Sequence, residues 1–352
     1  MSSTNVSTTA TAIAACITVA PDQNGYVPLD DCRNLWSYYP SFGAAVLFSI
    51  LFGITTVTHI VQARIYRKPF CWVIIMAGIW ETTGLILRVL STRNQINMGL
   101  YIPEELFILL APIWINAFVY MTLGRMVYYF LPEKKVAGIT ARKLATYFVC
   151  MDILSFAVQG VGGSMASGGQ QESASAVMTG IHVYMAGIGL QEFFILIFLC
   201  LAISFHRRML FLEKSGALVT IHLNPRWRPL LYALYATLGL ITTRIIYRLI
   251  QYSAGVLSTI PTHEVFFYCF DALPMFLALL VLNLAHPGRY LIGPDSEYPK
   301  KSRQQKKEEA REKKAAKKAR KEAKRLAKLQ RGENLGHGGE FLELGQFNKP
   351  TE

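Results

Sequence analysis

The chain has 352 residues, of which 52% are apolar and only 17% are charged, a composition too apolar for an ordinary soluble protein. Its net charge of +13 would suit a nucleic-acid-binding protein, but the segment 300–331 alone holds 16 Lys and Arg against 4 Glu. The rest of the chain is nearly neutral. The composition therefore predicts a membrane protein with one basic tail and gives no indication of a nucleic-acid partner.

Residues 1–41 are expected to form an extracellular segment. Their apolar stretch ATAIAACITVA is short and follows no basic region, which argues against a cleaved signal peptide. Cys16 and Cys32 both precede the first long apolar run. They would be able to form a disulfide if this segment is exposed to an oxidising compartment.

Seven apolar runs reach the roughly 20 residues that a helix needs to cross the hydrocarbon core. They are predicted at 42–61, 70–90, 106–130, 144–165, 178–205, 230–250 and 265–285. All seven should be α-helical, because lipid offers the backbone no other hydrogen-bond partners. The fold class is therefore an all-α polytopic membrane protein, with a transmembrane domain at 42–290 and a basic cytoplasmic tail at 291–352.

The distribution of Lys and Arg predicts the orientation of the spans. The connecting segments 62–69, 131–143 and 206–229 carry 3, 4 and 5 of these residues. The alternate segments, which are 1–41, 91–105, 166–177 and 251–264, carry 1, 1, 0 and 0. By the positive-inside rule the N-terminus lies outside and the C-terminus inside the cell.

Eight ionisable residues fall inside the predicted spans, four of each sign. They are Glu81, Asp152, Glu192, Asp271, Arg88, Arg125, Arg244 and Arg248. Charges at this depth cost roughly 2.5–3.5 kcal/mol each, so they should face the interior of the bundle. Arg125 lies near the cytoplasmic boundary, where snorkelling explains it. The others concentrate in the middle and outer half of the membrane.

Two interpretations of these charges remain open. They form either a salt-bridge network that only fixes helix register, or a polar cavity open to the outside or alternately to both sides. Glu81 and Arg88 are too far apart along one helix for direct contact, so each should pair across helices. We predict the pairs Arg88–Asp271 and Glu81–Arg244. Pro274 removes a backbone hydrogen bond near Asp271 and is predicted to act as a hinge.

Several sequence motifs are absent. No phosphate-binding G-x-x-x-x-G-K-[ST] loop occurs, and no Lys lies between 215 and 299 to form a retinal Schiff base. The seven His residues form no H-E-x-x-H or other metal-binding pattern, so an intramembrane zinc hydrolase would need unusual ligands. We expect no catalytic residue, no metal site and no cofactor.

The ordered motifs of the spans resemble those of the fungal lipid-translocating exporter family, also called RTA-like. The segment 38–60 is similar to its first-span signature, ETTGLILR (81–88) to its E-x-x-G-Y-x-x-R element, and 111–125 to its A-P…Y-x-x-L-G-R element. The likeness continues at 152–163, 180–191, 244–252, 263–276 and 286–288. Two positions depart from the family pattern, with Leu85 replacing a Tyr and Gln251 replacing a Glu.

The resemblance implies a seven-helix membrane protein that exports or flips lipid-like molecules, such as sphingoid bases or sterol-like amphiphiles, and confers resistance to toxic ones. We expect Glu81 and Asp271 to hold a cationic amine while the tail stays in lipid. The expected ligand-binding residues are Glu81, Arg88, Asp152, Gln159, His182, Gln191, Glu192, Arg244, Arg248 and Asp271.

Two further points are left open by the sequence. A seven-helix receptor that senses amphiphile or membrane stress is the alternative function, since the topology fits it equally well. The basic segment 300–331 either keeps the tail soluble or contacts anionic lipid of the cytoplasmic leaflet. The plasma membrane is the expected location, with an endomembrane as the alternative.

Overall fold

The computed structural model describes residues 17–166, 173–217, 226–253, 260–293 and 297–298, with a few helical residues between 311 and 323. In this described part, seven helices are long and apolar enough to cross a membrane, which confirms the all-α, seven-span prediction. Residues 1–298 form one compact unit and residues 299–352 another. Cys16, the predicted partner of Cys32, lies outside the described residues.

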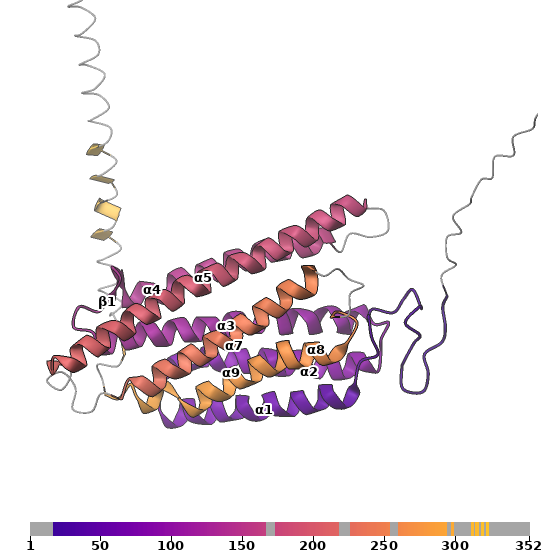
Figure 1. Cartoon of the computed structure of the whole chain (residues 1–352), viewed down its shortest axis with the longest axis horizontal. Coiled ribbons are helices and arrows are strands. Elements are labelled where there is room, and N and C mark those ends of the chain that lie inside the picture. The colour runs from indigo at the N-terminus through magenta and orange to yellow at the C-terminus, as the bar shows by residue number, and fades with distance from the viewer. Residues whose placement is uncertain are drawn as a thin grey trace, which may run out of the picture. The chain divides into compact units, whose positions relative to one another are not determined.

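The first unit is built almost entirely from helices (Figure 1). The elements are α1 (Phe42–Ile65), η1 (Pro69–Cys71), α2 (Trp72–Thr92), α3 (Met98–Phe130), β1 (Lys135–Val136), β2 (Ile139–Thr140), α4 (Ala141–Ala166), α5 (Ala174–Lys214), α7 (Arg228–Ser253), α8 (Glu264–Phe267), η2 (Tyr268–Ala272), α9 (Leu273–Leu284) and η3 (Pro287–Arg289).

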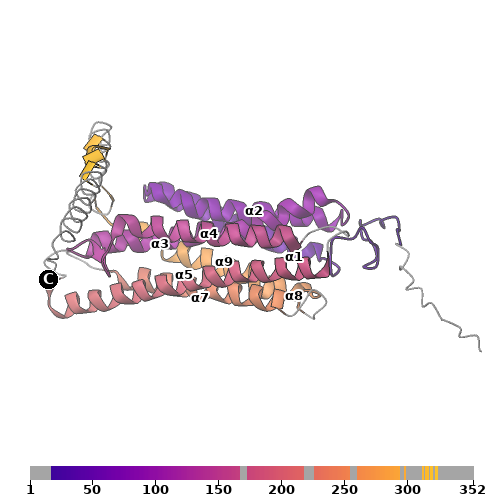
Figure 2. The ribbon, with the colours of Figure 1, turned by 90° about the horizontal axis from the view of Figure 1, so that it is seen from above.

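The long helices run side by side (Figure 2), and their contacts follow the chain order and close into a ring. Each contacts the next from α1 through α5, then α5 contacts α7, α7 contacts α9, and α9 returns to α1. Helix α3 also contacts α5, α7 and α9 and is the most buried of the seven spans. A bundle arranged around α3 brings side chains from distant parts of the sequence to one interior.

Helix α3 begins eight residues before the predicted start at 106. Its N-cap is Asn97, whose side chain accepts a hydrogen bond from the amide of Gly99 at 2.9 Å. The extension places Glu104 and Glu105 on a helix of the bundle rather than in a loop. Two prolines, Pro103 and Pro112, lie inside this helix.

The seventh span is not a uniform α-helix. It begins as α8, continues as the π-helical turn η2, and returns to α-helix at Leu273. Pro274 lies in the first turn of α9, directly after the π turn. The π turn makes the backbone irregular next to Pro274, where the sequence predicts a disrupted helix. A hinge motion at Pro274 stays a prediction.

The opposite end of the bundle carries a short hairpin, β1–β2, whose strands pair Lys135 with Thr140 and Val136 with Ile139. Ala137 and Gly138 form its turn with positive φ angles of 45° and 79°, as a two-residue hairpin requires. The Lys and Arg distribution predicts that this end faces the cytoplasm. The end carrying residues 93–97 and 260–263 is called the predicted outer end below.

Candidate ligand-binding site

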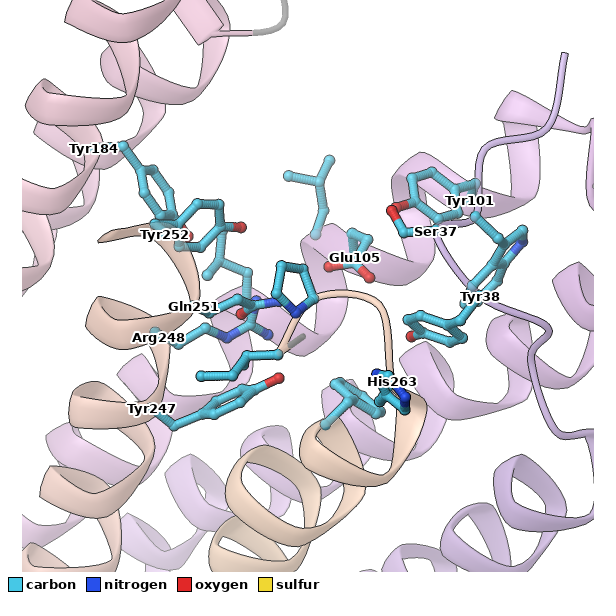
Figure 3. Close-up of a pocket in the computed structure, with 16 residues that line it drawn as sticks. Ser37, Tyr38, Tyr101, Glu105, Tyr184, Tyr247, Arg248, Gln251, Tyr252 and His263 are labelled. Atoms are coloured by element: carbon cyan, nitrogen blue, oxygen red, sulfur yellow. The ribbon is translucent and has the colours of Figure 1, made fainter. Parts of the chain in front are cut away.

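A cavity of about 390 Å³ opens at the predicted outer end of the bundle (Figure 3). Its walls come from the segment before α1, from α3, α5 and α7, and from the stretch leading into α8. The lining residues are Trp36, Ser37, Tyr38, Tyr101, Glu105, Leu106, Leu109, Tyr184, Tyr247, Arg248, Gln251, Tyr252, Ile260, Pro261, His263 and Phe267.

Five tyrosines line the cavity wall, and the polar side chains of Ser37, Glu105, Arg248, Gln251 and His263 accompany them. Glu105 points its carboxylate toward the middle of the cavity and has a 37% exposed side chain (Figure 3). Among the described residues, the buried Oε1 atom of Gln251 has no hydrogen-bond partner. A wall of this kind suits an amphiphile head group that brings its own donors and one charge.

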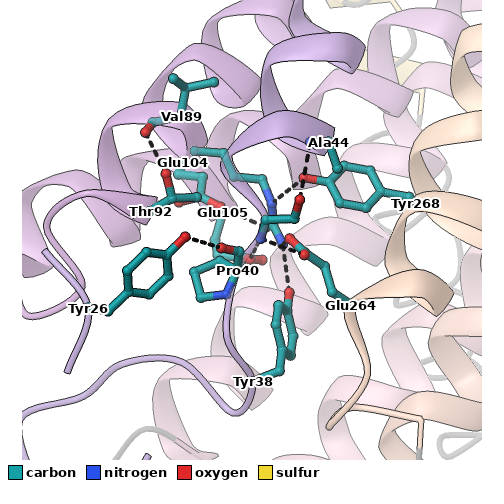
Figure 4. Close-up of polar contacts among 12 residues, drawn as sticks. Tyr26, Tyr38, Pro40, Ala44, Val89, Thr92, Glu104, Glu105, Glu264 and Tyr268 are labelled. Atoms are coloured by element: carbon teal, nitrogen blue, oxygen red, sulfur yellow. Dashed lines mark hydrogen bonds and ion pairs between the residues drawn. The ribbon is translucent and has the colours of Figure 1, made fainter. Parts of the chain in front are cut away.

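Arg88 lies beside this cavity at the centre of a buried ion cluster. Its Nη1 donates to Glu104 at 2.8 Å, and its Nη2 donates to Glu264 at 3.3 Å (Figure 4). The Arg88 and Glu104 side chains are both fully buried. Glu105 contributes a longer contact of 3.9 Å. One guanidinium therefore faces three carboxylates.

Two tyrosines complete the hydrogen bonding of Arg88. The hydroxyl of Tyr38 accepts from Nη2 at 2.6 Å and that of Tyr268 from Nε at 3.3 Å. Burial raises the pKa of Tyr38 to about 12, and the charge of Arg88 opposes this only in part. The neutral phenol accepts a hydrogen bond without cancelling a charge. The rings of Phe267 and Trp36 lie 4.1 and 4.7 Å from the guanidinium carbon.

A second ion cluster lies next to the cavity, on α7 and η2. Asp271 pairs with Arg244 at 2.5 Å and also with Arg248, and all three residues are buried. Arg244 donates a further hydrogen bond to the carbonyl of Ile108 at 3.0 Å. Because Asp271 is held between two guanidinium groups, it is not a free anion.

Both predicted cross-helix pairs are therefore wrong. Arg88 pairs with Glu104 and Glu264, which lie closer to it than Asp271 does, and Asp271 is taken by Arg244. Glu81 is buried near Arg244, Arg248 and Asp271, but its Oε1 has no hydrogen-bond partner within the described residues. The partners of Arg88 could not be foreseen from the hydropathy pattern, because it places Glu104 and Glu105 in an outer loop rather than on α3.

A smaller hollow of about 40 Å³ continues inward from the cavity, sharing Leu109, Tyr184 and Arg248 with it. Arg244, Gln159 and Gln191 line this hollow. Gln159 donates from Nε2 to Oε1 of Gln191 at 3.0 Å. A Cβ atom on Gly187 would approach the Gln159 backbone nitrogen to 2.8 Å, so only glycine permits this packing of α4 on α5.

The remaining predicted ligand-binding residues do not line either hollow. Asp152 accepts hydrogen bonds from Asn116 at 3.0 Å and Tyr120 at 3.1 Å, within the core of the bundle. Glu192 accepts one from Thr242 at 3.0 Å. His182 is exposed on the surface of α5. The structure thus brings Gln159, Gln191, Arg244, Arg248, Asp271 and Glu81 together, and places Arg88 in a separate cluster.

Glu104, Glu105 and Glu264 were missed by the sequence reasoning because they fell in segments assigned to outer loops. A signal for the first two existed, since Asn97 is a favoured N-cap residue and marks an earlier helix start. Their position gives the outer cluster a surplus of carboxylates. The inner group of Glu81, Asp271, Arg244 and Arg248 is balanced, with two residues of each sign.

Among the described residues, no group of three or more His, Cys, Asp and Glu side chains is arranged to hold a metal ion. The chemistry of the cavity rests on carboxylate, guanidinium, amide and phenol groups.

The chain is similar to several fungal proteins. It is 47% identical to the probable lipid transporter atnI of Emericella nidulans, over 87% of this chain and 81% of that protein. It is 29% identical to the protoporphyrin uptake protein 1 of Saccharomyces cerevisiae, over 71% and 91% of the two chains. It is 27% identical to the sphingoid long-chain base transporter RSB1 of the same organism, over 74% and 75%.

No solved structure matches the fold at a significant level. The sequence model of the family described as RTA1 like protein matches residues 74–293, which include six of the seven spans in full or nearly so. The arrangement of α2 to α9 around the two ion clusters lies within this matched region. The chain belongs to the RTA1-like family of membrane proteins.

Proposed function

We propose that this protein moves lipid-like amphiphiles with a cationic head group across the bilayer, and that the outer cavity binds the head group. The observation that carries the proposal is the position of Glu105, a carboxylate in the cavity wall whose contact with Arg88 is as long as 3.9 Å. The relatives support transport, since they are named for lipid transport, long-chain base transport and protoporphyrin uptake. None of these names supports the receptor alternative.

In this proposal the charged residues divide into two roles. Glu105 binds the amine, while Gln251 and the phenol groups of the wall form neutral hydrogen bonds to the rest of the head group. Gln159, Gln191, Arg244 and Arg248 lie along the inward continuation and would contact the head group as it moves deeper. Asp271 holds the two arginines in place rather than binding the amine, and Arg88 holds the outer wall together.

Transport assays on the purified protein in lipid vesicles test this role. The wild type should accelerate movement of a fluorescent long-chain amine between leaflets, and Glu105→Gln should slow it. A partly exposed ion pair contributes up to about 1 kcal/mol, which corresponds to a slowing of up to roughly fivefold. Glu133→Gln is the matched control, because Glu133 pairs with Arg208 at the opposite end of the bundle. Equal rates in protein-free and wild-type vesicles, with several amphiphiles tried, would refute the proposal.

We also propose the plasma membrane as the location, with the N-terminus outside, and contact between the segment 300–331 and anionic lipid of the cytoplasmic leaflet. The described residues of that segment are exposed, as such contact requires. Each basic residue near the membrane surface can contribute about 1 kcal/mol. Fluorescence microscopy of a tagged protein tests the location. Bound anionic vesicles should protect the tail from added protease. Neutralising the basic residues should weaken this protection and leave transport intact.

A further inference from the structure

We propose that the hydrocarbon tail of the amphiphile lies in an apolar groove on the lipid-facing side of α7, so that the molecule reaches the cavity sideways from the bilayer. This inference rests on the proposed function, since it assigns the tail of the same ligand whose head group the cavity binds. The occupant is a single hydrocarbon chain attached to a cationic head group.

The groove has a volume of about 280 Å³ and lies between α7 and the start of the seventh span. It is lined by Thr243, Ile246, Tyr247, Ile250, Ile260, Phe266 and Phe270. Ile246, Ile250 and Phe270 are 48%, 46% and 43% exposed, so the groove is open to the membrane. The hydroxyl of Thr243 is satisfied by the carbonyl of Gly239 at 2.9 Å, which leaves a surface suited to a hydrocarbon chain.

The groove and the cavity are neighbours, because Tyr247 and Ile260 line both. The ring of Tyr247 stacks on Phe270 with centroids 6.1 Å apart, and Phe270 stacks on Phe266 at 6.4 Å. These three rings form one wall of the groove. Tyr247 therefore marks the boundary between the apolar groove and the polar cavity. An amphiphile bound across Tyr247 would have its tail in the groove and its head group in the cavity.

The sequence of α7 explains this division. Arg244, Arg248 and Gln251 follow helical spacing and form a polar face toward the two hollows. Thr243, Ile246 and Ile250 follow the same spacing and form the groove face. Because successive helical residues are about 100° apart, Tyr247 lies between the two faces.

The dimensions fit one chain. From Thr243 to Ile250 the helix rises about 10.5 Å, against about 15 Å for one leaflet of the hydrocarbon core. The π turn η2 places Phe270 in the groove and the next residue, Asp271, against Arg244 and Arg248. One short segment thus shapes both surfaces.

Photolabelling tests the occupant directly. Wild-type protein in phosphatidylcholine vesicles is irradiated with a long-chain amine that carries a photoreactive group on its tail. We expect label on residues 243–250 and 266–270, and we expect excess unlabelled amine to remove it. The inference is wrong if added phosphatidylcholine without a photoreactive group removes the label as well as the unlabelled amine does. It is also wrong if the label lies on other residues.

A substitution gives a second, independent measurement. Ile246→Trp should fill the groove and slow movement of the long-chain amine at least about fivefold. Ile54→Trp is the matched control, since Ile54 is 60% exposed on α1, away from the groove. Suppose that the wild type transports the amine, that its groove residues are not labelled, and that Ile246→Trp transports normally. These results would refute the groove as the tail site and leave the proposed function standing. Competable groove labelling in a wild type that transports nothing would uphold the groove and refute the proposed function.

Discussion

Arg88→Met is the substitution whose consequence the structure predicts most sharply. Methionine has a similar length and fills the same apolar space, but it removes the cation that Glu104, Glu264 and Glu105 share. Glu104 suffers most, because its side chain is fully buried and its second oxygen, Oε2, already has no hydrogen-bond partner among the described residues.

The expected cost can be estimated from burial. Leaving one partner of a buried ion pair uncompensated costs about 3–5 kcal/mol. The hydrogen bonds to Tyr38 and Tyr268 are lost too, at about 0.5–1.5 kcal/mol each, although these losses overlap. Glu264 and Glu105 add less, since their side chains are 11% and 37% exposed and reach solvent. A total of at least about 3 kcal/mol corresponds to a drop in melting temperature on the order of 10 °C.

The assay is heating of the detergent-solubilised protein followed by size-exclusion chromatography of what remains folded. Arg88→Met should melt well below the wild type. The double variant Arg88→Met/Glu104→Gln should recover part of the loss, because the glutamine leaves no buried unpaired charge. Melting of Arg88→Met at the wild-type temperature would refute this account of the cluster, and so would a double variant no more stable than the single one.

Three further predictions follow from other parts of the bundle. Asp271→Asn leaves Arg244 and Arg248 buried without the carboxylate they share, so the same thermal assay should show a loss of about 3–5 kcal/mol. Gly162→Val should also lower the melting temperature, because a Cβ atom there would lie 2.3 Å from the Tyr184 backbone nitrogen. Gly160→Val is its control and should be tolerated, because a Cβ atom at Gly160 meets no atom within 4 Å. Gln251→Glu adds a carboxylate to the cavity and should tighten binding of a fluorescent long-chain amine by up to about fivefold, as titration in detergent would show. Binding of a neutral amphiphile should not change.

Much of the fold follows from the sequence because the membrane imposes strong rules. Hydropathy and the absence of other backbone partners are enough to predict seven helices, and all seven are present. Helix ends are harder, since amphipathic turns at the interface have low hydropathy. Residues 98–105 illustrate this, because Asn97 caps a helix there although Glu104 and Glu105 make the stretch too polar for a hydropathy criterion. The orientation of the termini stays a prediction.

The ion pairs could be predicted only in part. The sequence correctly indicates that Arg244, Arg248 and Asp271 turn inward, because lipid penalises each of them. It does not indicate which side chain meets which, since this depends on the rotation of each helix about its axis. Asp271 could pair with Arg88 by depth, but the π turn at Tyr268–Ala272 shifts the helical phase, and Asp271 meets the two arginines of α7.

The π turn also connects the irregular backbone to the proposed transport. A π-helical turn stores a wider, less favourable hydrogen-bond pattern than the α-helix, and it persists only where neighbouring contacts stabilise it. Here those contacts are the two salt bridges of Asp271 on one side and the stacked ring of Phe270 on the other. A cationic head group in the cavity would repel Arg248, which lines the cavity, and so weaken the first contact, and a tail in the groove would displace the second. Pro274 follows in the first turn of α9 and cannot donate a backbone hydrogen bond, so we predict that ligand binding changes the shape of the bundle at this segment.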